Sequence, residues 1–210
     1  MIPAHDALER LKEGNRRFVA GERHIDADAL ALRRAELTEG QQPFAVILGC
    51  SDSRVPAEIV FDQGLGDLFV IRVAGNIVAP SLVGSVEFAA AEFGTRLVVV
   101  MGHSRCGAVT ATIADILHPS DAHSKNLRAI VDRVRPSVET LMDTDLRHDR
   151  EALIHAAVRA NVRVSADHLR HGSVVLEELI REDRLLVVGA EYSLETGVVD
   201  FFDGVPEENR

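Results

Sequence analysis

Four short, almost continuously apolar segments constrain the fold of this chain more than any other feature. They cover residues 44–49, 68–73, 97–101 and 185–190. Each is shorter than a typical helix and apolar at consecutive positions, which is typical of a strand buried on both faces of a parallel sheet. Segments of helical character separate them, at 56–62, 81–93, 106–117 and 125–181. Strands that alternate with helices predict a doubly wound α/β fold, with a mostly parallel sheet of four strands and helices on its faces.

The two ends of the chain are expected to extend this core. Apolar residues recur at helical spacing in residues 1–40, which predicts an N-terminal helical arm with a second short helix over 27–38. The arm either packs on its own domain or embraces a partner subunit. Residues 41–210 are expected to complete a single domain, because a length of 210 residues suits one core. Residues 198–202 are expected to add an edge strand, and 206–210 to fray.

Net charge narrows the classes of function. The chain has 23 Lys and Arg residues against 33 Asp and Glu, a formal charge of −10, whereas nucleic-acid binders and polybasic membrane-surface proteins need a basic face. No apolar run reaches the roughly 18 residues that cross a bilayer, and the start lacks the pattern of a secretory leader. We therefore expect a cytoplasmic protein without nucleic-acid or membrane partners.

The residues that carry chemistry follow the predicted strands. Cys50 comes directly after the first strand, and His103 and Cys106 come just after the third. The carboxyl ends of parallel strands meet at one edge of a sheet, where ligands bind, so these side chains can converge. Two thiolates and one imidazole make a three-ligand zinc site with a fourth position open for water. Asp52 is then the candidate acceptor that orients the water, and Arg54 can hold Asp52 ionised.

Other interpretations of these residues are weaker. The two cysteines can be plain buried thiols, and a structural zinc site would need a fourth Cys or His ligand. The segment 102–106 approaches a nucleophile elbow, but Cys106 stands where that motif needs glycine. The segment 64–69 fails as a dinucleotide fingerprint, because Phe69 replaces the third glycine and the motif precedes a strand.

The two motifs together resemble the signature of the bacterial β-class carbonic anhydrases. The matching positions are Cys50, Asp52 and Arg54, followed by His103 and Cys106, each group leaving an apolar strand. The resemblance extends over most of residues 41–109. It implies reversible hydration of CO2 to bicarbonate and a proton, by a zinc-bound hydroxide at one zinc ion per chain. It also implies that Asp52 accepts the hydroxide's hydrogen bond while paired with Arg54, and becomes a fourth zinc ligand when the site closes at lower pH.

The resemblance assigns further positions to substrate. They are a glutamine that reaches the site from the neighbouring subunit, two side chains that line the CO2 pocket, and a backbone N–H near the anion: Gln41, Phe69, Phe88 and Gly107. Each has a simpler alternative without a role in binding: Gln41 as a loop residue, the two phenylalanines as core residues, and Gly107 as a glycine that begins a helix. Arg72 and Tyr192 match two positions of a regulatory bicarbonate site found in some members, but Ile47 replaces the third, a tryptophan.

The resemblance also implies a homodimer or a dimer of dimers, in which the N-terminal arm wraps the partner. Two alternatives to a carbonic anhydrase stay open at this point. One is a zinc hydrolase of another small electrophile, such as a carbon–sulfur compound, on the same scaffold. The other is a zinc-stabilised binding protein without catalysis, against which the paired Asp52 and Arg54 argue.

Overall fold

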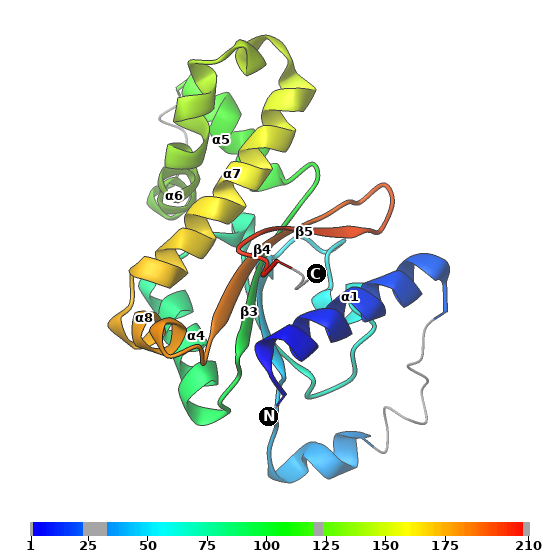
Figure 1. Cartoon of the computed structure of the whole chain (residues 1–210). Coiled ribbons are helices and arrows are strands. Elements are labelled where there is room, and N and C mark those ends of the chain that lie inside the picture. The colour runs from blue at the N-terminus through cyan, green and yellow to red at the C-terminus, as the bar shows by residue number, and fades with distance from the viewer. Residues whose placement is uncertain (1, 23–32, 120–123, 208–210) are drawn as a thin grey trace.

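A five-stranded sheet forms the centre of the computed structural model, which describes residues 2–22, 33–119 and 124–207 (Figure 1). The strands are β1 Ala45–Cys50, β2 Leu68–Val73, β3 Leu97–His103, β4 Leu186–Tyr192 and β5 Val199–Asp203. Their order in the sheet is β2-β1-β3-β4-β5, the first four are parallel, and β5 runs antiparallel to β4 at the edge. The predicted α/β class, the four parallel strands and the added edge strand are confirmed.

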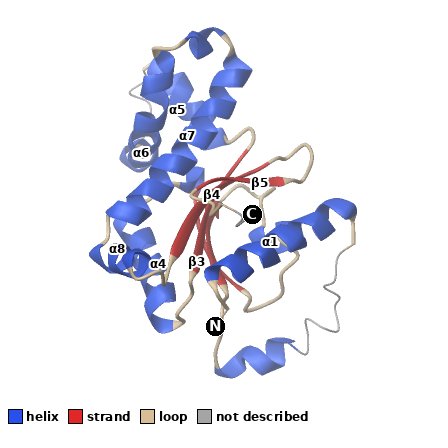
Figure 2. Cartoon of the chain, in the orientation of Figure 1, coloured by secondary structure: helices blue, strands red, loops and turns tan. Residues whose placement is uncertain are grey.

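Helices connect the strands and lie on both sides of the sheet (Figure 2). They are α1 Ala4–Ala20, α3 Ala57–Val60, α4 Pro80–Glu92, α5 Gly107–Leu117, α6 Lys125–Met142, α7 Arg150–His171 and α8 Val174–Arg181, with short 3-10 turns η1 Leu37–Glu39, η2 Ala74–Asn76 and η3 Asp145–His148. The helical region expected over 125–181 divides into three helices. Asp149 caps α7 by accepting two backbone N–H groups of its first turn, and Ser173 caps α8 by accepting one.

Parts of two expectations lie outside the described residues. Of the second arm helix expected over 27–38, residues 27–32 are not described, while 33–36 are helical and continue into η1. Of the tail expected to fray, residues 208–210 are not described. No helix among the described residues is long and apolar enough to cross a membrane.

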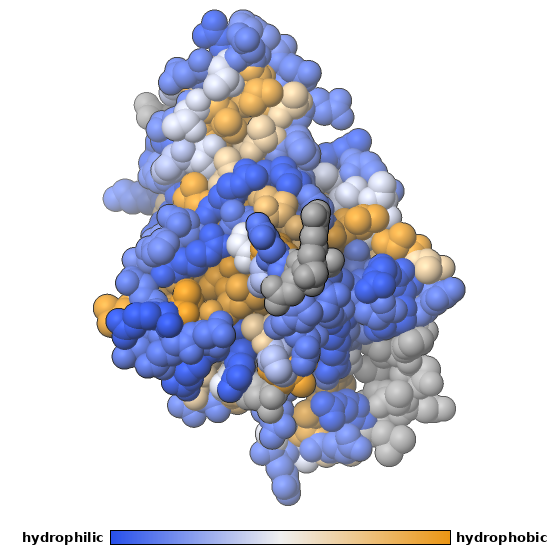
Figure 3. All heavy atoms as spheres, in the orientation of Figure 1, coloured by the Kyte–Doolittle hydropathy of each residue, from blue (hydrophilic) through white to orange (hydrophobic). Residues whose placement is uncertain are grey.

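Alternate residues of the strands feed two separate apolar layers. Ile47 and Val99 point to the face that α1 and α3 cover, whereas Leu48 and Val100 point to the face covered by α4, α7 and α8. This arrangement explains why the strands are apolar at consecutive positions. Outside this core the face drawn in Figure 3 is mostly hydrophilic, with apolar residues gathered in separate patches.

Helix α1 packs on the sheet of its own chain. Leu8 and Leu11 are buried in the core, and Gly14 lies so close to the carbonyl of Phe61 that a Cβ there would overlap it. The buried amide of Asn15 bonds to backbone groups of both α3 and the turn before β5. The boundary near residue 40 and the role of the arm in a dimer stay predictions.

Beyond the carboxyl ends of the strands lies a third apolar cluster, which is formed mainly by helices. Helices α5, α6 and the first turns of α7 pack on one another there and form their own apolar cluster (Figure 1). Cys50 and Cys106 belong to this cluster. Cys50, His103 and Cys106 are therefore buried at this edge of the sheet, while Arg54 in the neighbouring loop is exposed.

Candidate metal centre

Three buried side chains meet at the carboxyl ends of the two central strands. Cys50 ends β1, His103 ends the neighbouring strand β3, and Cys106 is the N-cap of α5. One ligand atom from each lies within 4.8 Å of the other two. β1 and β3 are adjacent and parallel, so the sequence's expectation that these residues converge follows from the sheet order. Among the described residues, this is the group of His, Cys, Asp and Glu side chains whose geometry fits a metal ion.

The imidazole of His103 is oriented for a metal. Its Nδ1 lies 2.9 Å from the carbonyl oxygen of Ser104, so Nδ1 must carry the proton and donate it. Nε2 then presents its lone pair to the two sulfurs. This nitrogen is fully buried and has no hydrogen-bond partner among the described residues. A buried acceptor without a partner is costly, and a cation would satisfy it.

The two sulfurs are close enough to share one proton. A hydrogen bond from the Cys106 thiol lowers the pKa of Cys50 to about 4, against the opposing effect of burial, and the N–H of Gly75 adds to the lowering. The same hydrogen bond, together with burial, raises the pKa of Cys106. Cys50 is thus readily a thiolate, and a divalent cation in place of the shared proton would make both sulfurs thiolates.

Asp52 and Arg54 form a bidentate ion pair beside this cluster. Nε of Arg54 lies 2.9 Å from Oδ1 of Asp52, and Nη2 lies 2.8 Å from Oδ2. Hydrogen bonding from Arg54 lowers the pKa of Asp52 well below its ordinary range. The carboxylate Oδ2 lies 3.9 Å from Nε2 of His103. An ionised acceptor therefore stands next to the candidate ligands, paired with Arg54; its predicted move to a fourth ligand position stays a prediction.

A carboxylate that sequence reasoning missed holds the loop between the ligands. Glu195, in the turn between β4 and β5, accepts a hydrogen bond from the Ser104 hydroxyl at 2.8 Å and pairs with Nε of Arg105 at 2.7 Å. Arg105 has a left-handed backbone, with a φ of 55°, that needs such support. No motif marks Glu195, because it lies 91 residues from Ser104 in the chain.

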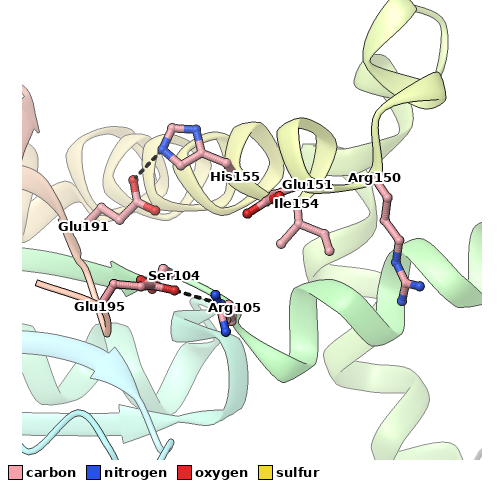
Figure 4. Close-up of a pocket in the computed structure, with 8 residues that line it drawn as sticks. All are labelled: Ser104, Arg105, Arg150, Glu151, Ile154, His155, Glu191 and Glu195. Atoms are coloured by element: carbon pink, nitrogen blue, oxygen red, sulfur yellow. Dashed lines mark hydrogen bonds and ion pairs between the residues drawn. The ribbon is translucent and has the colours of Figure 1, made fainter.

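A cavity of about 500 Å³ opens on the outer side of this loop (Figure 4). Charged side chains of both signs line it, and none of the three candidate ligands does. His155 of α7 faces Glu191 of β4 across one part of it, and Arg105 faces Glu195 across another. The cavity is thus separate from the group formed by Cys50, His103 and Cys106, which is called the metal cluster below because it fits one metal ion.

The residues predicted to bind substrate fall into two places. Gly107 begins α5 next to Cys106, and open space lies beside it. Gln41, by contrast, precedes β1 and lines a cavity of about 610 Å³ at the other end of the sheet. Phe69 sits near the start of β2, about 13 Å along the strand from its carboxyl end, and its ring contacts that of Phe88, which is 51% exposed. Within one chain, Gln41 and the two rings do not reach the metal cluster.

The two residues predicted for regulation are also far apart. Arg72 donates to the backbone carbonyls of Cys50 and Asp52, and so supports the loop that carries them. Tyr192 lies on β4, which β1 and β3 separate from the strand of Arg72. Its ring packs near Phe18 of α1, and burial raises its pKa. Their joint role in binding bicarbonate stays a prediction.

Fold and site together define a class of protein: an α/β protein with a Cys-His-Cys group that fits a metal ion at the carboxyl ends of parallel strands. A family model described as carbonic anhydrase matches residues 45–199. Carbonic anhydrase 2 of Mycobacterium tuberculosis is 41% identical over 191 residues, covering 91% of this chain and 89% of that protein. A carbonic anhydrase of Mycolicibacterium smegmatis is 40% identical, covering 92% and 91%.

Solved structures agree with the sequence comparisons. The β-carbonic anhydrase CafA of Aspergillus fumigatus superimposes with a TM-score of 0.74 at 26% identity, covering 86% of each chain. The β-carbonic anhydrase CcaA gives a TM-score of 0.73 at 26% identity, covering 97% of this chain and 94% of that one. The chain belongs to the β-class carbonic anhydrase family.

Proposed function

We propose that this protein is a zinc enzyme that catalyses the reversible hydration of CO2 to bicarbonate and a proton. The observation that carries the proposal is the buried cluster of Cys50, His103 and Cys106 next to the carboxylate of Asp52. Thiolate sulfur and imidazole nitrogen are donors that zinc prefers, and three protein ligands leave a position for water. We infer one zinc ion per chain. The relatives described above are carbonic anhydrases, so the alternative of a hydrolase for another small electrophile is not favoured.

Zinc held by this cluster would supply a Lewis acid that lets water lose a proton near neutral pH. The residues of the chain orient that water. Asp52, kept ionised by Arg54, has lone pairs left to accept the water's hydrogen bond and so turns a water lone pair toward CO2. The N–H of Gly107 would donate to an oxygen of the bicarbonate that forms, since the start of α5 attracts anions. At lower pH we expect Asp52 to leave Arg54 and occupy the position of the water.

The rate of CO2 hydration is expected to rise with pH, because the attacking water must first lose a proton. Asp52 is not the group that causes the rise: its pKa is lowered, so it is already ionised at the acidic end of the range. Stopped-flow assays of the zinc-loaded protein from about pH 6 to pH 9 test this. A rate that stays flat over that range would contradict the mechanism.

We also propose that the active unit is a homodimer or a dimer of dimers. Support comes from the position of Gln41, Phe69 and Phe88, which are too far from the metal cluster of their own chain to act there, and from the exposure of the Phe88 ring. The β-carbonic anhydrases of Sordaria macrospora, which share this fold at 24% identity, are described as tetrameric. A second chain would bring its own Gln41, Phe69 and Phe88 to the cluster. A cytoplasmic location, proposed alongside, suits two free thiols.

Mixed dimers test the shared site. His103→Asn removes a candidate ligand and Gln41→Ala a pocket residue, and each variant alone is expected to be nearly inactive. Unfolded and refolded together, they should regain about a quarter of the wild-type rate, because half of the dimers are hybrids with one intact site. No recovery, with hybrids demonstrated by a tag on one chain, would mean that each chain builds its site alone.

A further inference from the structure

A backbone N–H donates to one of the candidate ligand sulfurs. The turn η2 follows β2 and places the nitrogen of Gly75 3.3 Å from Sγ of Cys50. The turn is unusual, because Gly75 and Asn76 both have left-handed backbones, with φ of 75° and 44°. Such a turn persists only where its surroundings hold it. Whatever fixes the backbone conformation of Gly75 therefore also helps to fix this N–H···S hydrogen bond.

Helix α7 holds the other side of the same turn. Nδ2 of Asn161 donates to the Gly75 carbonyl oxygen at 2.7 Å. One helical turn further on, the hydroxyl of Ser165 donates to the carbonyl of Asn76 at 3.0 Å. The hydroxyl of Ser137 on α6 donates to Oδ1 of Asn161 at 3.3 Å, which sets the orientation of the amide. A chain of hydrogen bonds thus runs from α6 through Asn161 and the Gly75 turn to the sulfur of Cys50.

These groups are buried where an apolar side chain would be expected. Asn161 is only 1% exposed and lies between Val158 and Val162, which both belong to apolar clusters. An amide in such surroundings costs free energy unless each polar atom is bonded, as both are here. Gly75 also lies close to α5, where only glycine fits, because a Cβ would stand 2.9 Å from Cβ of Ala108. The turn is thus packed against α5 on one side and bonded to α7 on the other.

We propose that Asn161 is a positioning residue for the metal centre: it holds the carbonyl of Gly75, and the N–H of the same residue donates to the sulfur of Cys50. A hydrogen bond to a thiolate stabilises its negative charge and draws electron density away from the metal. The bond therefore tunes both how tightly the cluster holds a cation and how strongly that cation activates water. The inference rests on the proposed zinc centre and extends it to a residue that touches neither metal nor substrate.

The test compares zinc affinity in two matched variants of the full-length protein. Asn161→Leu removes both hydrogen bonds of the amide at nearly constant volume. Asn15→Leu is the control: Asn15 is also buried and bonds three backbone groups, but on α1, at the opposite face of the sheet. Competition with a chromophoric chelator gives the zinc dissociation constant. Cobalt(II) substitution gives the energy of the sulfur-to-metal charge-transfer band, which reports on the coordinated thiolates, Cys50 among them.

We expect Asn161→Leu to bind zinc about 10- to 100-fold more weakly than the wild type and to shift the cobalt band. Asn15→Leu should lower the melting temperature but leave both quantities unchanged. Unchanged affinity and an unchanged band in Asn161→Leu would overturn the proposal. If that variant does not fold, Ser137→Ala decides: a several-fold loss of affinity supports the role of Asn161, and no loss overturns it. Failure of the wild type to bind zinc would instead refute the proposed function.

Discussion

The variant His103→Asn is expected to lose both bound zinc and CO2 hydration, with the rate falling to that of buffer alone. Asparagine keeps a donor near the position of Nδ1, so the hydrogen bond to the Ser104 carbonyl can form, while the metal-facing Nε2 is gone. Two thiolates without the imidazole hold zinc poorly, and the loss of affinity should exceed the about 10- to 100-fold typical of an outer partner. Atomic emission after dialysis measures the zinc bound per chain, and stopped-flow assays measure the rate of CO2 hydration.

His155→Asn is the matched control for this variant. His155 lies on α7, with its side chain 63% exposed, and faces Glu191 outside the metal cluster. Its replacement should leave zinc content and hydration at wild-type values. If His103→Asn kept a full zinc ion per chain, His103 would not be a ligand and the site would have to be assigned elsewhere.

The variant Asp52→Asn is expected to keep its zinc and to lose hydration by about 10²- to 10⁴-fold in kcat/KM. The amide has no negative charge to strengthen the hydrogen bond from the attacking water, and one of its two terminal atoms becomes a donor. It also loses the ion pair with Arg54, which holds the carboxylate in place. Zinc content and stopped-flow rates at alkaline pH, where the wild type is most active, separate binding from catalysis.

Asp203→Asn provides the control for the loss of an Asp–Arg pair. Asp203 pairs with Arg170 at 2.7 Å, and its side chain is 19% exposed against 18% for Asp52, but it lies on β5. The control should fold with lower stability and full specific activity. Equal losses of activity in both variants would point to a general effect of breaking ion pairs and against a role of Asp52 at the site.

Sequence patterns predicted the sheet well, because burial on both faces leaves a plain signal. The strand at 68–73 was placed to the residue, and the edge strand within one residue at each end. The predicted ends of two strands were too early, because the apolar pattern stops before the strand does. β3 continues from residue 101 to His103, and β4 from residue 190 to Tyr192. The helical region 125–181 gave no sign of where it would divide, because its breaks depend on caps such as Asp149, which look like ordinary polar residues.

The candidate ligands were also predictable, because strand ends in a parallel sheet converge. The residues that hold the loops around these ligands were not predictable. Asn161 bonds Gly75 from 86 residues away in the chain, Glu195 bonds Ser104 from 91 residues away, and neither belongs to a local motif. Gln41 and Phe69 show a different limit: sequence similarity marks them for substrate, but only the fold reveals that they stand at the far end of the sheet from the metal cluster of their own chain.

Zinc content and CO2 hydration, measured on one preparation of the wild-type protein at alkaline pH, test the central claim most directly. We predict one zinc ion per chain and catalysed hydration of CO2. Removal of the zinc by a chelator should abolish hydration, and returning zinc should restore it. One zinc ion per chain without catalysed hydration at alkaline pH would contradict the assignment of this metal centre to CO2.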